Sequence, residues 1–207
     1  MKRVRSTRNM LSIMLSLMFI AANVCPALAE TGVSSELFVP MRLQQGLLLK
    51  SISYARGTIS RISKELNIVV VYDKDSVAVK DDFQKTFDEN FKNFLVNNLP
   101  IKLTAADATG CDFSKPALAK ILPEGINVIY VAFPLDKKKT KSLFEYTTAA
   151  GIMTASGIDT NIDSGFSLGI LLNKETAKPE IIVHQKTAEL EQCDFNPVLY
   201  KLSKVVQ

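Results

Sequence analysis

Two apolar stretches decide the fold, Ile68-Val69-Val70-Val71-Tyr72 and Asn127-Val128-Ile129-Tyr130-Val131-Ala132-Phe133. Neither stretch alternates apolar with polar residues, and the first is rich in β-branched side chains. Short unbroken runs of this kind are typical of strands that are buried on both faces of a parallel sheet. Ile101 to Ala105 and Ile152 to Ala155 are interpreted as two further short strands. The sequence therefore predicts a central parallel sheet whose two faces are covered by helices.

Helical patterns alternate with these strands. From Pro40 to Leu66, apolar residues recur at spacings of three, four and seven, which predicts one long helix despite Gly46 and Gly57. An aromatic stripe in residues 83–95 predicts a second helix with a buried face; it consists of Phe83, Phe87, Phe91, Phe94 and Leu95. Shorter helices are expected at 116–122 and 140–149, and Gly151 is expected to end the latter.

The C-terminal part predicts a different arrangement. Phe166 to Leu172 and Glu180 to Val183 are joined by the polar, turn-rich segment 173–179, which favours an antiparallel hairpin. A terminal helix is expected from Pro197 to Val206. The predicted fold class is therefore α/β, a mostly parallel three-layer αβα sheet with a C-terminal antiparallel hairpin and a terminal helix.

The first 29 residues have the three-part order of a secretory signal peptide. A basic head is followed by an apolar run from Met10 to Val24 and then by Ala27-Leu28-Ala29, an A-x-A cleavage site. An uncleaved anchor, or a lipoprotein that uses Cys25, is the alternative. We expect cleavage after Ala29, a flexible leader over 30–39, one domain over 40–207 and a periplasmic location.

Removal of this segment changes the charge and the cysteine count. Four of the 25 basic residues and none of the 21 acidic residues precede Glu30, so 21 of each sign remain. A balanced charge gives no support for nucleic-acid binding. Cys111 and Cys193 are the remaining cysteines; they are a disulfide candidate, or else two separate buried thiols.

The sequence contains no recognisable catalytic constellation. Gly165-Phe166-Ser167-Leu168-Gly169 matches the nucleophile-elbow pattern of hydrolases, but an apolar strand follows it where that elbow needs a helix. His184 is the single histidine and ends an apolar strand, so a structural role is favoured. We expect no enzymatic activity, no metal site and no cofactor.

A ligand site is predicted at the carboxyl ends of the strands, where open α/β sheets bind small molecules. The candidate residues are Asp73, Phe133, Pro134, Lys137, Ser156 and Gly157. Lys137, Lys138, Lys139 and Lys141 form a basic run beside them, which is either a solvated loop or an attraction for an anionic ligand, lipid or partner.

Several segments resemble the YfiR-like family of periplasmic regulators, and together they cover most of residues 40–206. They are Leu47-Leu48-Leu49-Lys50 with Tyr54, Ile129-Tyr130-Val131, Gly151 to Gly157, Ile162 to Gly169, Lys178 to His184, Asp194-Phe195 and Leu199 to Val206.

The resemblance implies a sensor or repressor that binds the periplasmic part of an inner-membrane signalling protein. Such a partner is typically a diguanylate cyclase, so the implied outcome is restraint of cyclic di-GMP signalling and of biofilm formation. A homodimer and a small-molecule signal are further implied partners. The alternative function is that of a periplasmic small-solute-binding protein.

Overall fold

A computed structural model describes residues 39–207 of the 207-residue chain. Within them the strands form one sheet in the order β2-β3-β1-β4-β5-β6-β7-β8. The predicted signal peptide over 1–29, its cleavage site after Ala29, Cys25 and nearly all of the predicted leader over 30–39 lie outside the described residues.

The centre of the sheet is parallel, as predicted. Its strands are β1 (Leu66–Tyr72), β3 (Leu99–Asp107), β4 (Val128–Val131), β5 (Met153–Ser156) and β6 (Leu168–Leu172). β1 lies between β3 and β4, and β5 and β6 continue the parallel pairing. Every residue of β4 and of β5 is buried. Full burial of each aliphatic side chain contributes roughly 1.5–3 kcal/mol, which explains why β4 lacks polar alternation.

Both edges of the sheet depart from this pattern. β7 (Pro179–His184) is antiparallel to β6, which confirms the predicted hairpin. At the far edge β2 (Leu95–Val96) is antiparallel to β3. The terminal helix is shorter than predicted: α9 (Pro197–Leu202) ends early, and β8 (Lys204–Val206) pairs with β7. The β-branched residues Val205 and Val206 satisfy backbone groups of β7 that a longer helix would leave unpaired.

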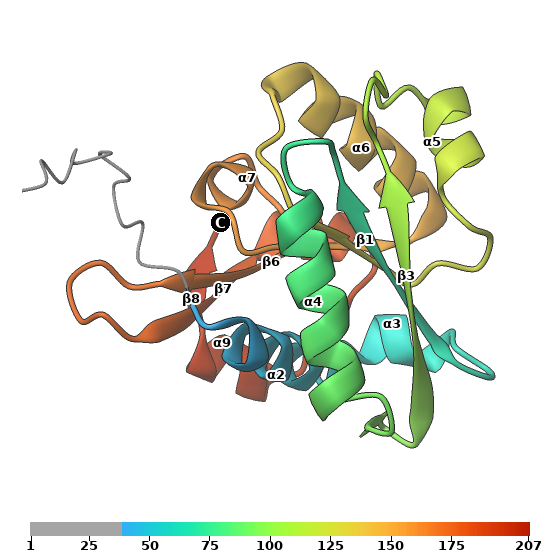
Figure 1. The fold of residues 1–207 in the computed structure, drawn as a ribbon. Helices are drawn as coiled ribbons and strands as arrows, with labels where there is room; N and C mark the ends of the chain where they lie inside the picture. Colours follow the sequence, from blue (N-terminus) through green and yellow to red (C-terminus); the bar gives the residue numbers. More distant parts are fainter. Residues whose placement is uncertain (1–38) are drawn as a thin grey trace, which may run out of the picture. The chain divides into compact units, whose positions relative to one another are not determined.

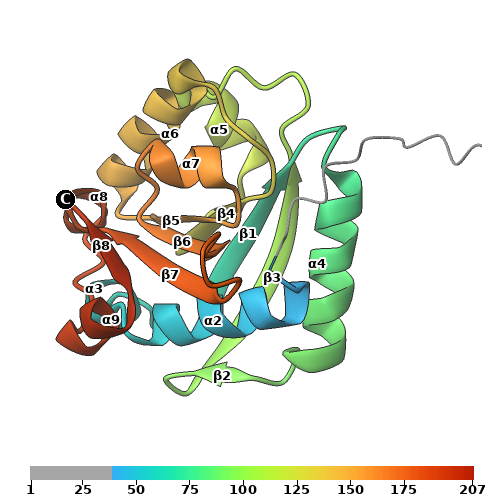
Figure 2. The same ribbon diagram turned by 90° about the vertical axis from the view of Figure 1, so that its left-hand side faces the viewer.

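Helices cover both faces of the sheet, as Figures 1 and 2 show. α2 (Met41–Ser53) and α4 (Val77–Asn90) lie on one face, and α5 (Lys115–Ile121), α6 (Lys137–Ala150) and α7 (Asp159–Asp163) lie on the other. Each face has its own apolar core, with Phe83 and Tyr130 in one and Phe113 and Phe166 in the other. The three-layer αβα prediction is confirmed.

The long helix predicted over residues 40–66 is two helices, and the single-helix prediction was wrong. α2 ends at Ser53, and α3 (Arg56–Ser60) follows after a turn. Ala55 in this turn forms an isolated β-bridge with Phe195, so tertiary contact breaks the periodic pattern. Position 57 requires glycine, because a Cβ there would lie 2.2 Å from the Gln192 carbonyl oxygen.

The aromatic stripe is only partly buried. α4 ends at Asn90, Phe83 and Phe87 lie in the core, and Phe94 is 49% exposed beyond the end of the helix. The prediction of a buried face therefore holds for Phe83 and Phe87 and fails for Phe94 and Leu95, which are exposed. The helix ends too early to carry these two residues onto its buried face.

The candidate disulfide between Cys111 and Cys193 is not formed, and both cysteines are free thiols, as in the alternative interpretation. Cys193 is buried in the core that contains Phe83, whereas Cys111 packs at the edge of the core that contains Phe113. The sheet separates the two cores, so the sulfur atoms cannot reach bonding distance. Burial raises the pKa of the Cys193 thiol to about 12, which makes this thiol unreactive at neutral pH.

Candidate functional site

Most of the predicted strand-end residues are engaged in internal contacts. Asp73 accepts hydrogen bonds from the backbone N–H of Ser76 at 3.0 Å and from its hydroxyl at 2.8 Å, which orders the turn before α4. The buried ring of Phe133 packs edge-to-face on Phe113, with centroids 6.3 Å apart. Pro134 is exposed. Asp73, Phe133 and Pro134 do not line the groove between α6 and α7 that is described below.

Asn161 of α7 occupies the space beside Ser156 at the ends of β4 and β5. Its amide nitrogen donates to the Phe133 carbonyl at 2.8 Å and to the Ser156 hydroxyl at 3.1 Å. Its amide oxygen accepts from the Leu135 N–H at 2.8 Å. Asn161 and Ser156 are both fully buried. The five-residue helix α7 is too short to show a periodic pattern in the sequence, so the position of Asn161 at these strand ends was not predicted.

Gly157 is enclosed in a similar way. A Cβ at this position would lie 1.7 Å from the side-chain nitrogen of Gln44 and 2.8 Å from the Tyr130 hydroxyl oxygen. The strand ends at β4 and β5 are therefore filled by side chains of α2 and α7.

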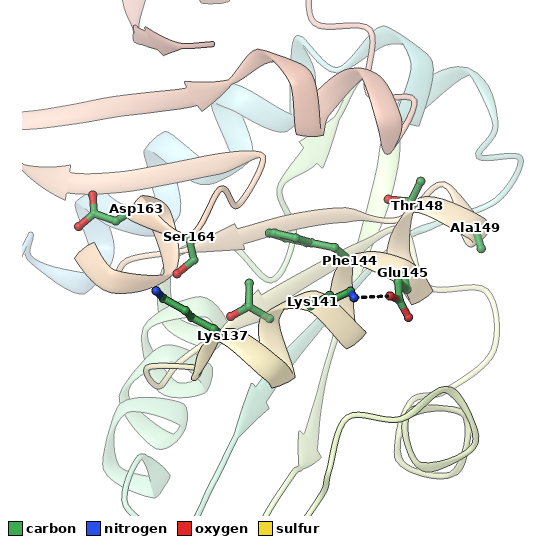
Figure 3. Close-up of a pocket in the computed structure, with 9 residues that line it drawn as sticks. Lys137, Lys141, Phe144, Glu145, Thr148, Ala149, Asp163 and Ser164 are labelled. Atoms are coloured by element: carbon green, nitrogen blue, oxygen red, sulfur yellow. Dashed lines mark ion pairs between the residues drawn. The ribbon is translucent and has the colours of Figure 1, made fainter.

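A groove beside the predicted site is the candidate functional site. It lies between α6 and the end of α7, has a volume of about 730 Å³, and includes Lys137 of the predicted set (Figure 3). Its lining residues are Lys137, Thr140, Lys141, Phe144, Glu145, Thr148 and Ala149 of α6, with Asp163 and Ser164. The α6 residues recur at spacings of three and four, so one face of that helix forms a whole wall. Small-molecule sites have volumes of about 300–1,000 Å³, and the groove falls within this range.

The lysine run begins α6 and is not a loop. Asp136 caps the helix, because its carboxylate accepts from the Lys139 backbone N–H at 2.9 Å. This acidic cap offsets part of the repulsion between the lysines and the positive end of the helix dipole. The prediction that the helix begins at Thr140 was therefore three residues late.

The four lysines have four different environments. The Lys139 ammonium lies 5.8 Å from the centroid of the Phe113 ring, and Lys141 pairs with Glu145 at 3.9 Å. Lys138 contributes to a lowered pKa of Asp112, of which hydrogen bonds from Ser114 are the main cause. Lys137 makes no ion pair within residues 39–207 and reaches toward Ser164 in Figure 3. Lys137 is therefore the cation available at this end of the groove.

The floor of the groove is aromatic. The half-buried Phe144 ring stands edge-on to the buried Phe166, with centroids 5.6 Å apart. This contact fixes the ring and leaves part of it facing the groove. Sequence reasoning missed Phe144; the helical spacing of seven from Lys137 is the signal that links the two residues.

A buried carboxylate holds the other side of α6. Glu191, which follows α8 (Gln185–Leu190), is fully buried and accepts hydrogen bonds from the Thr147 hydroxyl at 2.7 Å and the Thr154 N–H at 2.8 Å. The hydroxyl groups of Thr154 and Ser167 also donate to it. Burial outweighs these bonds and raises the pKa of Glu191 to about 7. Because the group is shielded from solvent, we assign it a structural role.

The hydrolase-like motif does not form an elbow. Ser167 is fully buried, its hydroxyl donates to Glu191, and β6 begins at the next residue. His184 ends β7, and burial lowers the pKa of its imidazole. Within residues 39–207 no group of three or more His, Cys, Asp or Glu side chains is placed to hold a metal ion.

The described chain belongs structurally to the α/β class with a mostly parallel sheet between helical layers. No protein-family model matches the sequence, and no curated protein matches it. Among residues 39–207, no helix has both the length and the apolar composition required to cross a membrane.

Two solved structures share this fold. A conserved domain protein from Vibrio cholerae is 12% identical, with a TM-score of 0.54 over 81% of this chain and 60% of that one. The ABC domain in complex with L-Trp from Streptococcus pneumonia is 11% identical, with a TM-score of 0.51 over 76% of this chain and 61% of that one. The chain thus spans about three fifths of the length of each structure.

Proposed function

We propose that this protein is a non-catalytic binding domain of the periplasm that takes a small organic molecule in the groove between α6 and α7. The observation that carries the proposal is the groove itself: about 730 Å³, an aromatic floor, and a cation without an ion pair in the described chain. A concave apolar surface with a few polar groups at its ends is the usual form of a small-molecule site.

Three further observations support this function. The Streptococcus domain with the same fold holds L-Trp, which agrees with a fold that binds small solutes. The signal-like segment over 1–29 agrees with export. The buried position of Ser167 agrees with the absence of hydrolase chemistry, since a nucleophile must reach its substrate.

The test is a thermal-shift screen of small metabolites against the purified protein, followed by comparison of two tryptophan variants. Ala149 and Ala150 are adjacent and both exposed at the end of α6, but only Ala149 lines the groove. Ala149→Trp should abolish the stabilisation that a screening hit gives, and Ala150→Trp should retain it. The proposed function would be contradicted if the metabolites stabilised Ala149→Trp as much as the wild type, or if no metabolite stabilised the wild type.

A second function is that of a YfiR-like regulator, and a specific surface favours it. Among residues 39–207, β8 is the last strand of the sheet, and no described strand pairs with the outer side of its backbone, which could accept an added strand. Val198, Leu202 and Val205 on α9 and β8 are exposed, and Leu202 has an exposed fraction of 60%. Exposed apolar side chains beside an open edge fit contact with the periplasmic part of an inner-membrane signalling protein, or with a second copy of the chain.

Leu202→Glu tests this second function without disturbing the core. The variant should lose crosslinking to a membrane diguanylate cyclase from the same host and leave the wild-type melting temperature unchanged. Sedimentation of the wild type and of Leu202→Glu would show whether the surface instead joins two copies of the chain. If Leu202→Glu crosslinks to the cyclase as well as the wild type does, this surface no longer supports the second function.

A further inference from the structure

We propose that the groove between α6 and α7 recognises a small carboxylate with an apolar body, with Lys137 holding the carboxylate and Phe144 contacting the body. This assignment rests on the proposed function and adds the chemical class of the ligand. It follows from which charges of the groove are already neutralised and from the order of the side chains along α6.

The charges of the groove are not equivalent. Lys141 and Glu145 are one helical turn apart and pair with each other at 3.9 Å, so they leave little net charge at the rim. Asp163 lies close to His184, on whose pKa it acts, and its carboxylate is drawn pointing away from Phe144 in Figure 3. Lys137 is therefore the charge that remains for a ligand, and it selects an anion.

Two hydroxyl groups lie at the same end of the groove. Ser164 donates its proton to the Thr160 carbonyl oxygen at 2.7 Å, so it presents only lone pairs toward the ammonium of Lys137. Thr140, one turn along α6 from Lys137, has a side-chain oxygen without a hydrogen-bond partner in the part of the chain described, although the residue is only 4% exposed. A buried hydroxyl without a partner is unfavourable, and a rotation of the Thr140 side chain that lets a ligand oxygen accept from it would relieve this.

The rest of the groove is suited to an apolar body. The Phe144 ring lies about two turns along α6 from Lys137, and Thr148 and Ala149 continue the same wall. Two turns of helix span about 11 Å, which leaves room for a ligand the size of an aromatic acid between the ammonium and the far wall. A ring stacked on Phe144 would gain the geometry that aromatic pairs favour.

The experiment measures binding of 3-phenylpropionate by titration calorimetry and compares it with two matched probes. The neutral 3-phenylpropanamide has the same shape without the charge, and propionate has the charge without the ring. We expect both to bind at least about tenfold more weakly than 3-phenylpropionate. The amide loses a hydrogen bond to a charged group, which is worth about a factor of ten or more, and propionate loses the apolar contact of the ring with Phe144.

Three variants assign the contacts. Lys137→Gln should weaken binding of 3-phenylpropionate about tenfold or more, and Lys138→Gln, its exposed neighbour outside the groove, should leave it unchanged. Thr140→Val removes the hydroxyl group at nearly constant shape, so binding should weaken severalfold while the melting temperature is retained or raised.

The outcomes separate this assignment from the proposed function. The carboxylate assignment would be overturned if Lys137→Gln and Lys138→Gln lost the same affinity for 3-phenylpropionate, or if the wild type bound the acid and its amide with equal affinity. If screening hits occupy the groove but 3-phenylpropionate does not bind, the assignment fails and the binding function stands. If nothing enters the groove, both fail.

Discussion

Neutralising the buried carboxylate of Glu191 should remove a specific part of the pH dependence of stability. The folded protein holds this carboxyl at a pKa of about 7, against an ordinary value of 4.5, because burial disfavours the charged form. Within residues 39–207 no basic side chain pairs with it to offset that effect. The folded state therefore binds a proton more tightly than the unfolded state between these two pKa values.

The sign and size follow from proton linkage. Where the folded state binds more protons, the free energy of unfolding falls as pH rises. The contribution of Glu191 is fully present below pH 4.5 and is lost as pH rises through about 7. This difference in pKa corresponds to roughly 3 kcal/mol, most of which is lost between pH 5 and pH 8.

The assay is urea unfolding at pH 5, 6, 7 and 8 for the wild type, Glu191→Gln and the control Glu189→Gln. Glu189 lies on the same helix but is exposed, so its substitution should leave the pH profile parallel to that of the wild type. The difference in free energy of unfolding between the wild type and Glu191→Gln should change by roughly 2–3 kcal/mol from pH 5 to pH 8. Parallel profiles for all three proteins would refute the reasoning, because they would mean that Glu191 is already charged at pH 5.

Three further predictions concern the packing. Asn161→Ala removes three buried hydrogen bonds and should lower the free energy of unfolding by about 3 kcal/mol, which urea unfolding at pH 7 measures. Gly57→Ala places a Cβ 2.2 Å from a backbone oxygen and should lower the melting temperature, whereas Gly46→Ala, with 3.7 Å to its nearest neighbour, should stabilise α2 by about 1 kcal/mol. In the folded protein an alkylating reagent should label Cys111 and spare the buried Cys193, and unfolding should expose both; peptide mapping by mass spectrometry distinguishes the two sites.

The sequence predicted those parts of the fold that depend on long apolar runs. β1 and β4 follow directly from the segments 68–72 and 127–133, and the αL conformation of Gly151 ends α6 as expected. Helix α7 could not be predicted, because its five residues are mostly polar. Its role depends on the side-chain amide of Asn161, which contacts the ends of two strands. The break between α2 and α3 likewise depends on a distant contact, the Ala55–Phe195 bridge.

The candidate site shows the same division. The sequence identified Lys137, because a run of lysines after a strand is visible without a structure. It placed the ligand over Ser156 and Gly157, which Asn161 and Gln44 cover in the folded chain. The side chains that fill these strand ends come from segments with no sequence signal of their own. The rule that open α/β sheets bind ligands at the carboxyl ends of their strands therefore located the edge of the sheet but not the open surface beside it.

The buried carboxylate and the groove are two sides of one arrangement. Glu191 binds Thr147, which precedes the groove residue Thr148 on α6. It also binds Ser167, which follows Phe166, the ring that supports Phe144. Thus one side chain holds the helix that forms the wall and the strand end that supports the floor. Because Thr147 and Ser167 carry hydroxyl groups that can donate or accept, they can bond the amide of Glu191→Gln as well as a carboxyl group. That variant should therefore lose the part of the pH dependence that Glu191 causes, while the groove keeps its shape and its affinity for 3-phenylpropionate.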